Sequence, residues 1–211
     1  MCGRFTLRSS PKTVADAFGV PEVPTLFPRY NICPRQSVAV VRQKPQGDGR
    51  ELAMVRWGLI PSWADDPKIG DRLINARSET AASKPSFRHA FRSRRCLIVA
   101  DGFYEWQKLE GRKQPYLFAL DGDRPFGMAG MWERWDKQGE AIETCTILTT
   151  SANETVQPFH ERMPVILPPE SYDAWLDPRS QDTAKLADLL RPFPAKAIHA
   201  SPVTTSLTGQ A

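Results

Sequence analysis

The chain has 211 residues, of which 41% are hydrophobic and 25% are charged. These proportions are typical of an ordered globular protein and exclude wholesale disorder. Lysine and arginine number 28 against 24 acidic residues, and a net charge of +4 is too small to identify a polyanionic partner by itself. The length favours a single domain, which we place at residues 2–211.

Short apolar runs and widely spaced cysteines exclude several classes of protein. The longest runs, 96–100 and 116–120, have five residues, whereas a membrane helix needs roughly 20. No apolar stretch follows the N-terminal arginines, so no cleaved secretory signal is expected and the predicted location is the cytoplasm. The four cysteines form no C-x-x-C pair, so no metal site and no disulfide framework are predicted, and nothing indicates an organic cofactor.

The first part of the chain is predicted to contain one helix and one hairpin. Residues 12–18 favour a short helix, whereas 20–34 hold four prolines and are predicted to form an irregular loop. Two segments with strand composition, 38–42 and 51–57, flank a glycine-rich turn at 46–49. Because such a turn between two strand-like segments is a hairpin signal, we expect these segments to pair.

The segment 86–94 has the pattern of a basic amphipathic helix. Phe87 and Phe91 are four positions apart and therefore share one face. Arginines follow at similar spacing on another face: Arg88, Arg92 and Arg95. A solvated surface explains this basic face, and a surface that contacts phosphates is the alternative.

Strands dominate the next part of the chain. A buried strand is predicted at 96–100, and it leads into an Asp-Gly turn. Three more strands are expected at 116–120, 126–132 and 142–148. Because their connections are short, we expect these three strands to run antiparallel.

The remaining helices are predicted from capping signals and pattern. Ser151 and Glu154 have the spacing of a capping box, which predicts a short helix after the last strand. Two further helices are expected at 170–175 and 182–190. Together the elements predict an α+β fold with a mixed, mainly antiparallel, barrel-like sheet and peripheral helices.

Position 2 holds the most informative residue. Aminopeptidases remove an initiator methionine that precedes a small residue, so Cys2 is expected to become the N-terminus. Its amine and thiol, on adjacent carbons, can then condense with an aldehyde to a Schiff base that the sulfur closes to a thiazolidine. At pH 7 an α-amine is neutral far more often than a lysine amine, which makes it the better nucleophile. The alternative is that Cys2 is an incidental small residue.

Six motifs occur in a fixed order along the chain. They are Met-Cys-Gly-Arg-Phe at 1–5, Arg-Tyr-Asn at 29–31 with Pro34, Trp-Gly-Leu-Ile-Pro-Ser-Trp at 57–63, Leu-Ile-Asn-Ala-Arg-Ser-Glu-Thr at 73–80, Asp-Gly-Phe-Tyr-Glu-Trp at 101–106 and His-Glu-Arg-Met-Pro at 160–164. In this order they resemble the motif set of the SOS-response-associated peptidase (SRAP) family, over residues 2 to about 168.

The resemblance implies a protein that binds single-stranded DNA and attaches itself covalently to abasic sites. In this family the N-terminal cysteine captures the ring-opened deoxyribose aldehyde as a thiazolidine. The peptidase of the family name refers to proposed removal of the protein's own initiator methionine. Abasic single-stranded DNA is therefore the expected partner, at the nucleoid during DNA damage. No membrane and no obligate protein partner are expected.

Four positions match the catalytic residues of the family. Cys2 matches the crosslinking residue, and Asn75 the polar residue beside it. Glu105 matches the catalytic carboxylate and His160 the catalytic histidine. Partial burial between two aromatic neighbours would raise the pKa of Glu105 and suit it to general acid and base catalysis. Taken without the family, Asn75 is a turn residue, Glu105 a surface residue of an edge strand and His160 a packed histidine.

Basic and aromatic side chains near these positions are candidates for DNA contacts. Arg4, Arg77 and Arg162 lie inside the motifs and are expected to hold phosphates. Trp63 and Trp106, which we place in loops, are expected to stack on the bases that flank the lesion. Three other tryptophans are assigned to the core: Trp57, Trp132 and Trp175.

Two other functions are compatible with the same residues. In an N-terminal-nucleophile hydrolase, the thiol of Cys2 would attack an amide with its own amine as the base. A non-covalent nucleic-acid-binding protein would use the basic helix and the tryptophans alone. A covalent adduct with abasic DNA that depends on Cys2 would distinguish the first function from both of these.

Overall fold

The computed structural model describes residues 2–46 and 48–204. The strands are β1 Phe5–Leu7, β2 Arg29–Ile32, β3 Ser37–Gln43, β4 Arg50–Trp57, β5 Asn75–Arg77, β6 Arg95–Ala100, β7 Gly102–Leu109, β8 Arg112–Leu120, β9 Phe126–Trp135, β10 Ile142–Ser151, β11 Arg162–Pro164, β12 Ile166–Leu167 and β13 Ile198–Pro202. The α-helices are α1 Pro11–Phe18, α2 Ser78–Ala81, α3 Arg88–Ser93, α4 Tyr172–Leu176 and α5 Thr183–Asp188. Short 3-10 helices lie at Pro67–Arg72, Asp121–Asp123, Pro169–Ser171 and Ala195–Ala197.

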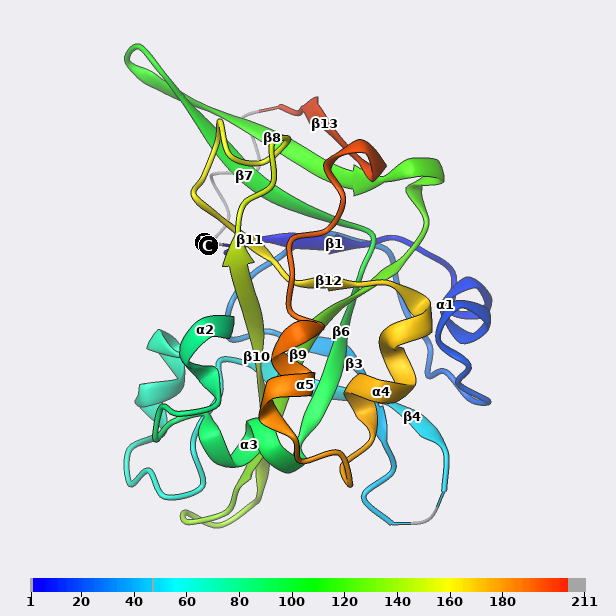
Figure 1. Cartoon of the computed structure of the whole chain (residues 1–211), viewed down its shortest axis with the longest axis vertical. Helices are drawn as coiled ribbons and strands as arrows, with labels where there is room; N and C mark the ends of the chain where they lie inside the picture. The colour runs from blue at the N-terminus through cyan, green and yellow to red at the C-terminus, as the bar shows by residue number, and fades with distance from the viewer. Residues whose placement is uncertain (1, 47, 205–211) are drawn as a thin grey trace.

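The pairings of β3, β4, β6, β9 and β10 close a β-barrel, which lies at the centre of the molecule (Figure 1). β3 pairs antiparallel with β4 and β6, β6 with β9, and β9 with β10. The ring is completed by β10 and β4, which run parallel, with Thr144 opposite Arg56. Closing the ring removes the free edges that an open sheet would have. The predicted α+β fold with a mixed, mainly antiparallel, barrel-like core is therefore confirmed.

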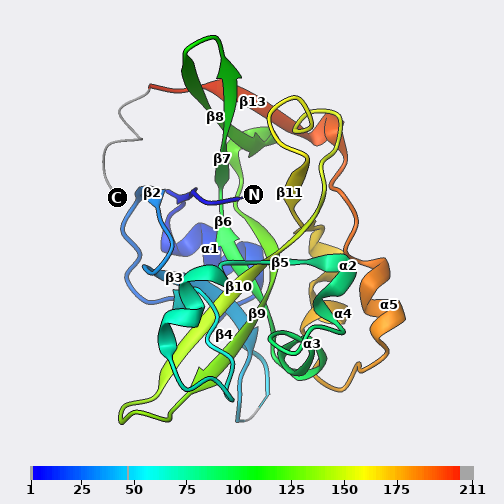
Figure 2. The ribbon, with the colours of Figure 1, turned by 90° about the vertical axis from the view of Figure 1, so that its left-hand side faces the viewer.

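A second sheet lies above the barrel in the view of Figure 1. Its strand order is β13-β8-β7-β1-β2, and all neighbours run antiparallel. β7 and β8 form a long hairpin that projects beyond the body of the molecule in both ribbon views (Figures 1 and 2). Glu110 and Gly111 make the two-residue turn at its tip, where the φ of Gly111 is +71°, a value that favours glycine.

The helices pack around the lower half of the barrel in Figure 1. α3 and α4 both contact β6, and the ring of Phe91 on α3 meets that of Trp175 on α4 edge-on, with centres 5.8 Å apart. The ring of Phe18 on α1 stacks on that of Tyr172 at 5.4 Å. These buried rings join the helices to the barrel in one apolar core. Within the described part of the chain, no helix has both the length and the apolar composition needed to cross a bilayer.

Most of the predicted elements are present with small shifts of boundary. The first predicted helix is α1, which ends at Gly19 in a left-handed conformation. The predicted hairpin is β3 with β4, and the four strands predicted after it are parts of β6, β8, β9 and β10. The two C-terminal helices are α4 and α5, and the side chain of Asp182 caps α5 by accepting from two backbone amides.

Two predictions of local structure are wrong. The segment 20–34 is not wholly irregular, because Arg29–Ile32 forms β2 and pairs with β1. Its prolines flank the strand at both ends and leave the ladder intact. The helix predicted from Ser151 is absent, since residues 152–161 form a series of turns. There the side chain of Asn153 accepts from the amides two and three positions later and caps a turn instead.

The tryptophan predictions are correct in part. Trp57 and Trp175 are fully buried, as expected for core residues. Trp132 is only half-buried, because its ring lies between the guanidinium groups of Arg42 at 4.0 Å and Arg94 at 5.8 Å. Trp106, which was predicted to lie in a loop, is a residue of β7.

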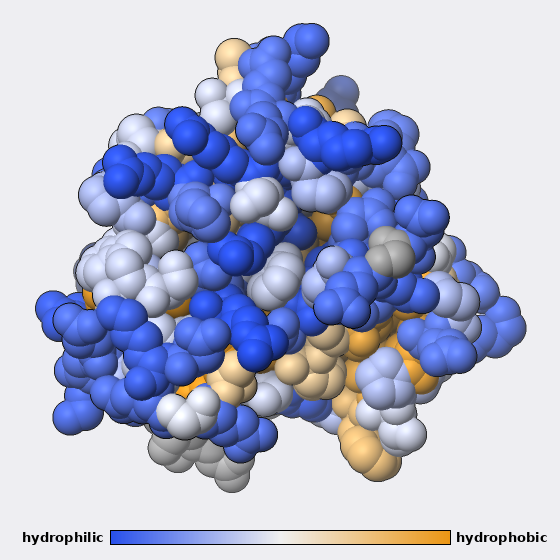
Figure 3. Space-filling view, turned by 90° about the horizontal axis from the view of Figure 1, so that it is seen from below, coloured by the Kyte–Doolittle hydropathy of each residue, from blue (hydrophilic) through white to orange (hydrophobic). Residues whose placement is uncertain are grey.

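The basic helix is present as α3, at the opposite end of the molecule from the β7–β8 hairpin (Figures 1 and 2). Arg88 and Arg92 are exposed, and the end seen from below in Figure 3 is mostly hydrophilic with small apolar areas. Arg95 does not belong to this basic face, because it begins β6 and is buried. The exposure of Arg88 and Arg92 is compatible with a solvated surface and with a surface that contacts phosphates, whereas Arg95 has a different role.

Arg95 joins α3, α4 and the segment after α4 through backbone carbonyls. Its Nε donates to Trp175 O at 2.6 Å, and its Nη1 donates to Phe91 O at 2.8 Å. Nη1 and Nη2 donate to three further carbonyls, of Arg92, Asp177 and Ser180. Burial lowers the pKa of this guanidinium to about 10. The charge is therefore stabilised mainly by carbonyl dipoles.

We expect an Arg95→Lys variant to lose about 2–4 kcal/mol of unfolding free energy, because an ammonium group cannot reach five carbonyls from one position. Chemical denaturation followed by circular dichroism measures this loss. Arg92→Lys is the matched control, since that side chain is exposed, and it should change stability by less than about 0.5 kcal/mol. Equal midpoints for the two variants would contradict the structural role of Arg95.

Candidate active site

The pairing of β1 with β7 brings two distant motifs together. The amide of Tyr104 on β7 donates to the carbonyl of Arg4 at 3.0 Å, which extends the antiparallel ladder of β1 toward the N-terminus. If the same register continues two residues further, from Arg4 to Cys2, it places Cys2 beside Glu105 and its neighbours. The predicted nucleophile and the predicted carboxylate are therefore adjacent.

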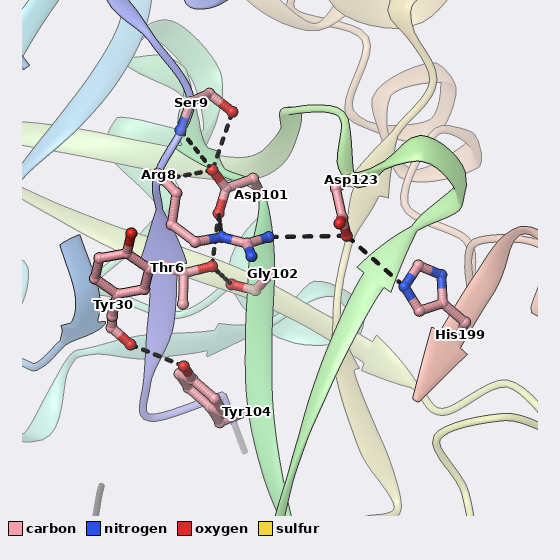
Figure 4. A network of polar contacts seen from close by, with 9 residues as sticks. All are labelled: Thr6, Arg8, Ser9, Tyr30, Asp101, Gly102, Tyr104, Asp123 and His199. Carbon is pink, nitrogen blue, oxygen red and sulfur yellow. Dashed lines mark hydrogen bonds and ion pairs between the residues drawn. The ribbon is translucent and has the colours of Figure 1, made fainter. Parts of the chain in front are cut away.

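A buried carboxylate fixes this register at the other end of β1 (Figure 4). Asp101 accepts from the hydroxyl of Thr6 at 2.6 Å. It also accepts from the amides of Arg8 at 2.5 Å and Ser9 at 2.8 Å. Burial alone would raise the pKa of Asp101, but these hydrogen bonds stabilise its charged form and lower the pKa. Asp101 directly precedes β7, so it ties β1 to the strand that carries Glu105.

Two further contacts hold β7 in place. A Cβ atom on Gly102 would lie 2.7 Å from Leu117 Cδ1 and 2.9 Å from Thr6 Oγ1, so any larger residue would require these side chains to move. The hydroxyl of Tyr104 donates to the carbonyl of Tyr30 on β2 at 2.8 Å (Figure 4). β1, β2 and β7 thus form one rigid support for the N-terminal residues.

The end of β10 gathers the other predicted residues. β5 runs parallel to β10 on one side, with Asn75 opposite Ile147 and Arg77 opposite Thr149. β11 runs antiparallel on the other side, with Arg162 opposite Ser151. Because β5 and β11 flank the same end of β10, motifs that are far apart in the sequence meet there.

Asn75 contacts Cys2 directly. Its Nδ2 donates to the carbonyl of Cys2 at 2.9 Å. Its Oδ1 is buried and has no hydrogen-bond partner among residues 2–46 and 48–204. A buried acceptor without a donor is costly, so this oxygen is suited to receive a hydrogen bond from a bound hydroxyl or amine.

Burial perturbs both titratable groups at the junction of β1 and β7. The side chain of Cys2 is fully buried, and burial together with the nearby Glu105 carboxylate raises the pKa of its thiol. Glu105 is 5% exposed, and burial raises the pKa of its carboxyl. This is the direction expected from the sequence. A carboxyl group with a raised pKa can deliver and accept protons nearer to neutral pH.

His160 lies at the end of the turns between β10 and β11. Its Nδ1 accepts from the backbone amide of Arg162 at 2.9 Å, which keeps the proton of the neutral ring on Nε2. Burial lowers the pKa of the imidazole, so the neutral form predominates at pH 7. His160 is therefore suited to act as a base or as a neutral hydrogen-bond donor.

A pocket of about 490 Å³ opens beside these residues. Its lining contains two of the predicted catalytic residues, Glu105 and His160, together with basic and aromatic side chains: Arg4, Trp106, Lys108, Lys113 and Phe159. One carboxyl group at the wall and three basic side chains around it make a site that is suited to an anionic ligand with a reactive polar centre.

The comparison with protein-family models identifies the chain. The model described as "SOS response associated peptidase (SRAP)" matches residues 1–209. The chain belongs to the SRAP family. It is 41% identical to "Abasic site processing protein YoqW" of Bacillus subtilis (strain 168), over 97% of this chain and 93% of that protein. It is 38% identical to "Abasic site processing protein HMCES" of Gallus gallus, over 84% and 62% of the two chains, and 30% identical to "Abasic site processing protein YedK" of Escherichia coli (strain K12), over 83% and 79%.

Solved structures share the fold of this SRAP chain. A protein from Bacteroides thetaiotaomicron superposes with a TM-score of 0.90 at 27% identity, covering 100% of this chain and 95% of its own. A protein from Bordetella bronchiseptica gives a TM-score of 0.80 at 31% identity, covering 96% and 100%. The family resemblance inferred from six motifs is thus confirmed at the level of sequence and of fold.

The three arginines of the SRAP motifs are placed differently. Nη1 of Arg4 donates to Asn31 Oδ1 at 2.8 Å, and Arg4 lines the pocket. Arg77 is exposed at the end of β5. Arg162 makes a bidentate pair with Glu79, with N–O distances of 2.7 and 2.8 Å. A phosphate contact by Arg162 would require this pair to open, so its observed contacts position β11 against α2.

The two predicted stacking tryptophans are also separated. Trp106 is half-buried on β7 and lines the pocket. Trp63 is 53% exposed in the loop after β4, where its Nε1 lies 3.4 Å from the carbonyl of Pro85. Trp63 is not among the residues that line the pocket.

Sequence analysis missed several residues of this region. Asp101 was treated only as part of a turn, although its place before the Gly-Phe-Tyr-Glu-Trp strand marks a residue that fixes that strand. The sequence prediction gives no role to Lys108 and Lys113, because it does not include the hairpin β7–β8 around Gly111. A two-residue turn that contains glycine, between Gln-Lys-Leu and Arg-Lys-Gln, is the signal that would have found them.

Proposed function

We propose that this SRAP protein processes abasic sites in single-stranded DNA by forming a covalent thiazolidine between Cys2 and the sugar of the lesion. The observation that carries the proposal is the junction of β1 and β7, where Cys2 meets Glu105 and is held by Asn75 beside the pocket that contains His160. The printed names of three relatives support DNA with abasic sites as the substrate. The proposal treats residues 2–211 as one functional domain.

The reacting groups in this proposal are the α-amine and the thiol of Cys2 and the aldehyde of the abasic sugar. Removal of Met1, by the protein itself or by an aminopeptidase, frees the α-amine of Cys2. The amine adds to the aldehyde carbon of the ring-opened sugar, and loss of one water from the carbinolamine forms a C=N bond. The sulfur adds to the same carbon, its proton passes to the nitrogen, and a five-membered ring closes. Removal of Met1 consumes one water and releases methionine, the condensation releases one water, and no electrons are exchanged.

Three side chains have defined tasks in this scheme. Glu105 delivers the proton that lets the sugar ring open and water leave, because burial raises the pKa of its carboxyl, which therefore keeps its proton to a higher pH than an ordinary glutamate does. Asn75 orients Cys2 through its Nδ2, and its Oδ1 accepts from the sugar hydroxyl or the Cys2 amine. His160, neutral and protonated on Nε2, hydrogen-bonds to the sugar oxygen or supports reversal of the link.

The DNA contacts in this proposal read no base sequence. Arg4 and Arg77 hold phosphates, and Arg162 joins them if its pair with Glu79 opens. Trp106 at the pocket, and Trp63 at the more distant loop, stack on bases that flank the lesion. Selectivity then comes from the aldehyde and the missing base. The protein would act in the cytoplasm, at the nucleoid during DNA damage, without an obligate protein partner, a membrane, a metal or a cofactor.

The raised pKa of the Cys2 thiol favours this function over an N-terminal-nucleophile hydrolase. A hydrolase uses the sulfur as its first nucleophile and needs it as a thiolate, but burial and Glu105 both disfavour the thiolate. In the thiazolidine scheme the amine reacts first, and the sulfur attacks only an activated C=N bond. The Schiff base formed before that step is also the species through which a lyase would cleave the strand, and ring closure removes it.

Intact mass spectrometry of the purified protein tests the proposal. Without DNA, the mass should correspond to the chain that lacks Met1. After incubation with a single-stranded oligonucleotide that contains one abasic site, we expect the summed mass of protein and DNA less one water, stable to heating. An undamaged oligonucleotide of the same sequence is the control and should give no adduct. A processed chain that gives no adduct with the abasic strand would exclude the proposed function.

A further inference from the structure

The hairpin β7–β8 carries two lysines directly opposite each other. The register pairs Lys108 with Lys113, and it pairs Trp106 with Pro115 two positions nearer to the barrel. Because side chains alternate along a strand and opposite residues share a face, Trp106, Lys108 and Lys113 lie on one face of the hairpin. Their common presence in the lining of the pocket agrees with this register.

The pair of lysines is electrostatically unfavourable by itself. Directly opposite side chains have Cβ atoms about 4.5–5.5 Å apart, and like charges at this spacing destabilise a sheet. Among residues 2–46 and 48–204, no carboxylate makes an ion pair with Lys108 or Lys113, whereas Lys12 pairs with Asp16 at 2.6 Å and Lys137 with Asp65 at 2.7 Å. An anion between the two ammonium groups would turn their repulsion into attraction.

We propose that Lys108 and Lys113 form a phosphate subsite for one linkage next to the abasic residue, with Trp106 as the platform for the neighbouring base. This inference rests on the proposed function and adds the part of the DNA that the hairpin holds. A nucleotide fits the face because it combines an anionic phosphate with a flat ring, and the face offers two cations next to one aromatic side chain.

The position of the subsite gives it a role in selecting the lesion. Lys108 and Lys113 line the same pocket as Glu105 and His160, so a phosphate between them fixes the strand beside the proposed reaction centre. The hairpin projects from the body of the molecule, as both ribbon views show (Figures 1 and 2), so a strand can approach the face from solvent. Binding there would orient the abasic sugar before any covalent step.

Arg112 provides a matched control on the same hairpin. It pairs with Leu109, one position along the ladder from the lysines, so its side chain points to the opposite face. It carries the same charge, is exposed as they are, and is not among the residues that line the pocket. Removing its charge lowers the net charge of the hairpin by one, half the change in a double lysine variant, without touching the proposed subsite.

The test measures binding of single strands that contain a tetrahydrofuran abasic analogue, which has no aldehyde and cannot be crosslinked. For Lys108→Gln/Lys113→Gln we expect roughly 10-fold weaker binding at low salt and a salt slope reduced by about 0.7, the value for one phosphate contact. Arg112→Gln should leave the slope unchanged. An equal reduction by Arg112→Gln would overturn the subsite and leave only a diffuse effect of charge.

Neutral linkages locate the phosphate. Methylphosphonates are placed one at a time on either side of the lesion analogue, and each strand is measured with the wild type and the double lysine variant. At one linkage, the loss of affinity caused by the methylphosphonate and the loss caused by the lysine substitutions should not be additive. Both changes would remove the same contact between phosphate and lysine. Additive losses at every flanking linkage would contradict the proposal. Failure of the proposed function is distinguishable, since it appears as a missing Cys2 adduct with a true abasic strand in the wild type.

Discussion

A Cys2→Ala variant is expected to form no covalent adduct with an abasic single strand, while it retains most of its salt-dependent affinity for DNA. Alanine keeps the N-terminal amine, so a reversible Schiff base can form, but no sulfur is present to close the ring. Cys2 is buried and contributes no charge to the surface, so phosphate contacts should be unaffected. Denaturing electrophoresis measures the adduct, and fluorescence anisotropy with a tetrahydrofuran analogue measures the affinity.

Three control variants test whether the adduct depends on the amine and the thiol of Cys2. Cys33→Ala should form as much adduct as the wild type, because Cys33 is half-buried, lies within 4 Å of Asn31 and is not at the N-terminus. Cys2→Ser should give a Schiff base that borohydride traps but little stable product, since oxygen closes a more labile ring. A residue inserted before Cys2 should prevent the adduct. An adduct that persists in Cys2→Ala, or in the blocked protein, would indicate another nucleophile.

The barrel and most strands could be predicted from the sequence because their signals are local. The glycine-rich turn between β3 and β4, the apolar run of β6 and the short connections of β8 to β10 each depend on neighbouring residues. β2 was missed for the opposite reason. Its four residues form a strand only because β1, more than 20 positions earlier, offers a hydrogen-bonding edge, and no local pattern contains that information.

The candidate site shows the same division between local and long-range information. Burial and the raised pKa of Glu105 follow from its position between Tyr104 and Trp106 in an apolar strand, which the sequence displays. The engagement of Arg162 by Glu79 could not be predicted, because it depends on the packing of β11 against α2 across the end of β10. Arg95 was assigned to a basic face by its spacing, but the helix ends before it and the side chain turns inward.

Glu105→Gln is expected to reduce the rate of adduct formation by about 10²–10⁴-fold at saturating abasic DNA. Glutamine keeps the shape of the side chain and cannot donate or accept a proton at the rates that ring opening and loss of water require. Single-turnover kinetics with quenched-flow sampling measure the rate. Gln107→Glu in the Glu105→Gln background serves as a control. It places a carboxyl group on the same strand, at the half-buried position two residues after Glu105. This second substitution should not restore the rate. A rate within about threefold of the wild type would exclude Glu105 as the proton donor.

The dependence on pH separates catalysis by Glu105 from a structural role. Burial raises the pKa of its carboxyl above the ordinary 4.5, so the folded state binds this proton more tightly than the unfolded state. The stability of the wild type should therefore fall as pH rises from about 4.5 through the raised pKa, and then level off. Glutamine has no such titration, so Glu105→Gln should be at least as stable as the wild type at neutral pH.

The pH profile of the rate of adduct formation should differ between loss of a proton donor and loss of stability. In the wild type, amine deprotonation increases the rate as pH rises toward about 8, and loss of the carboxyl proton decreases it, which gives a bell-shaped profile. In Glu105→Gln only the amine titrates, so the slow remaining rate should rise with pH to a plateau. A variant that is both slower and less stable at neutral pH, with a bell-shaped profile still present, would show that Glu105 supports the fold and that another group transfers the proton.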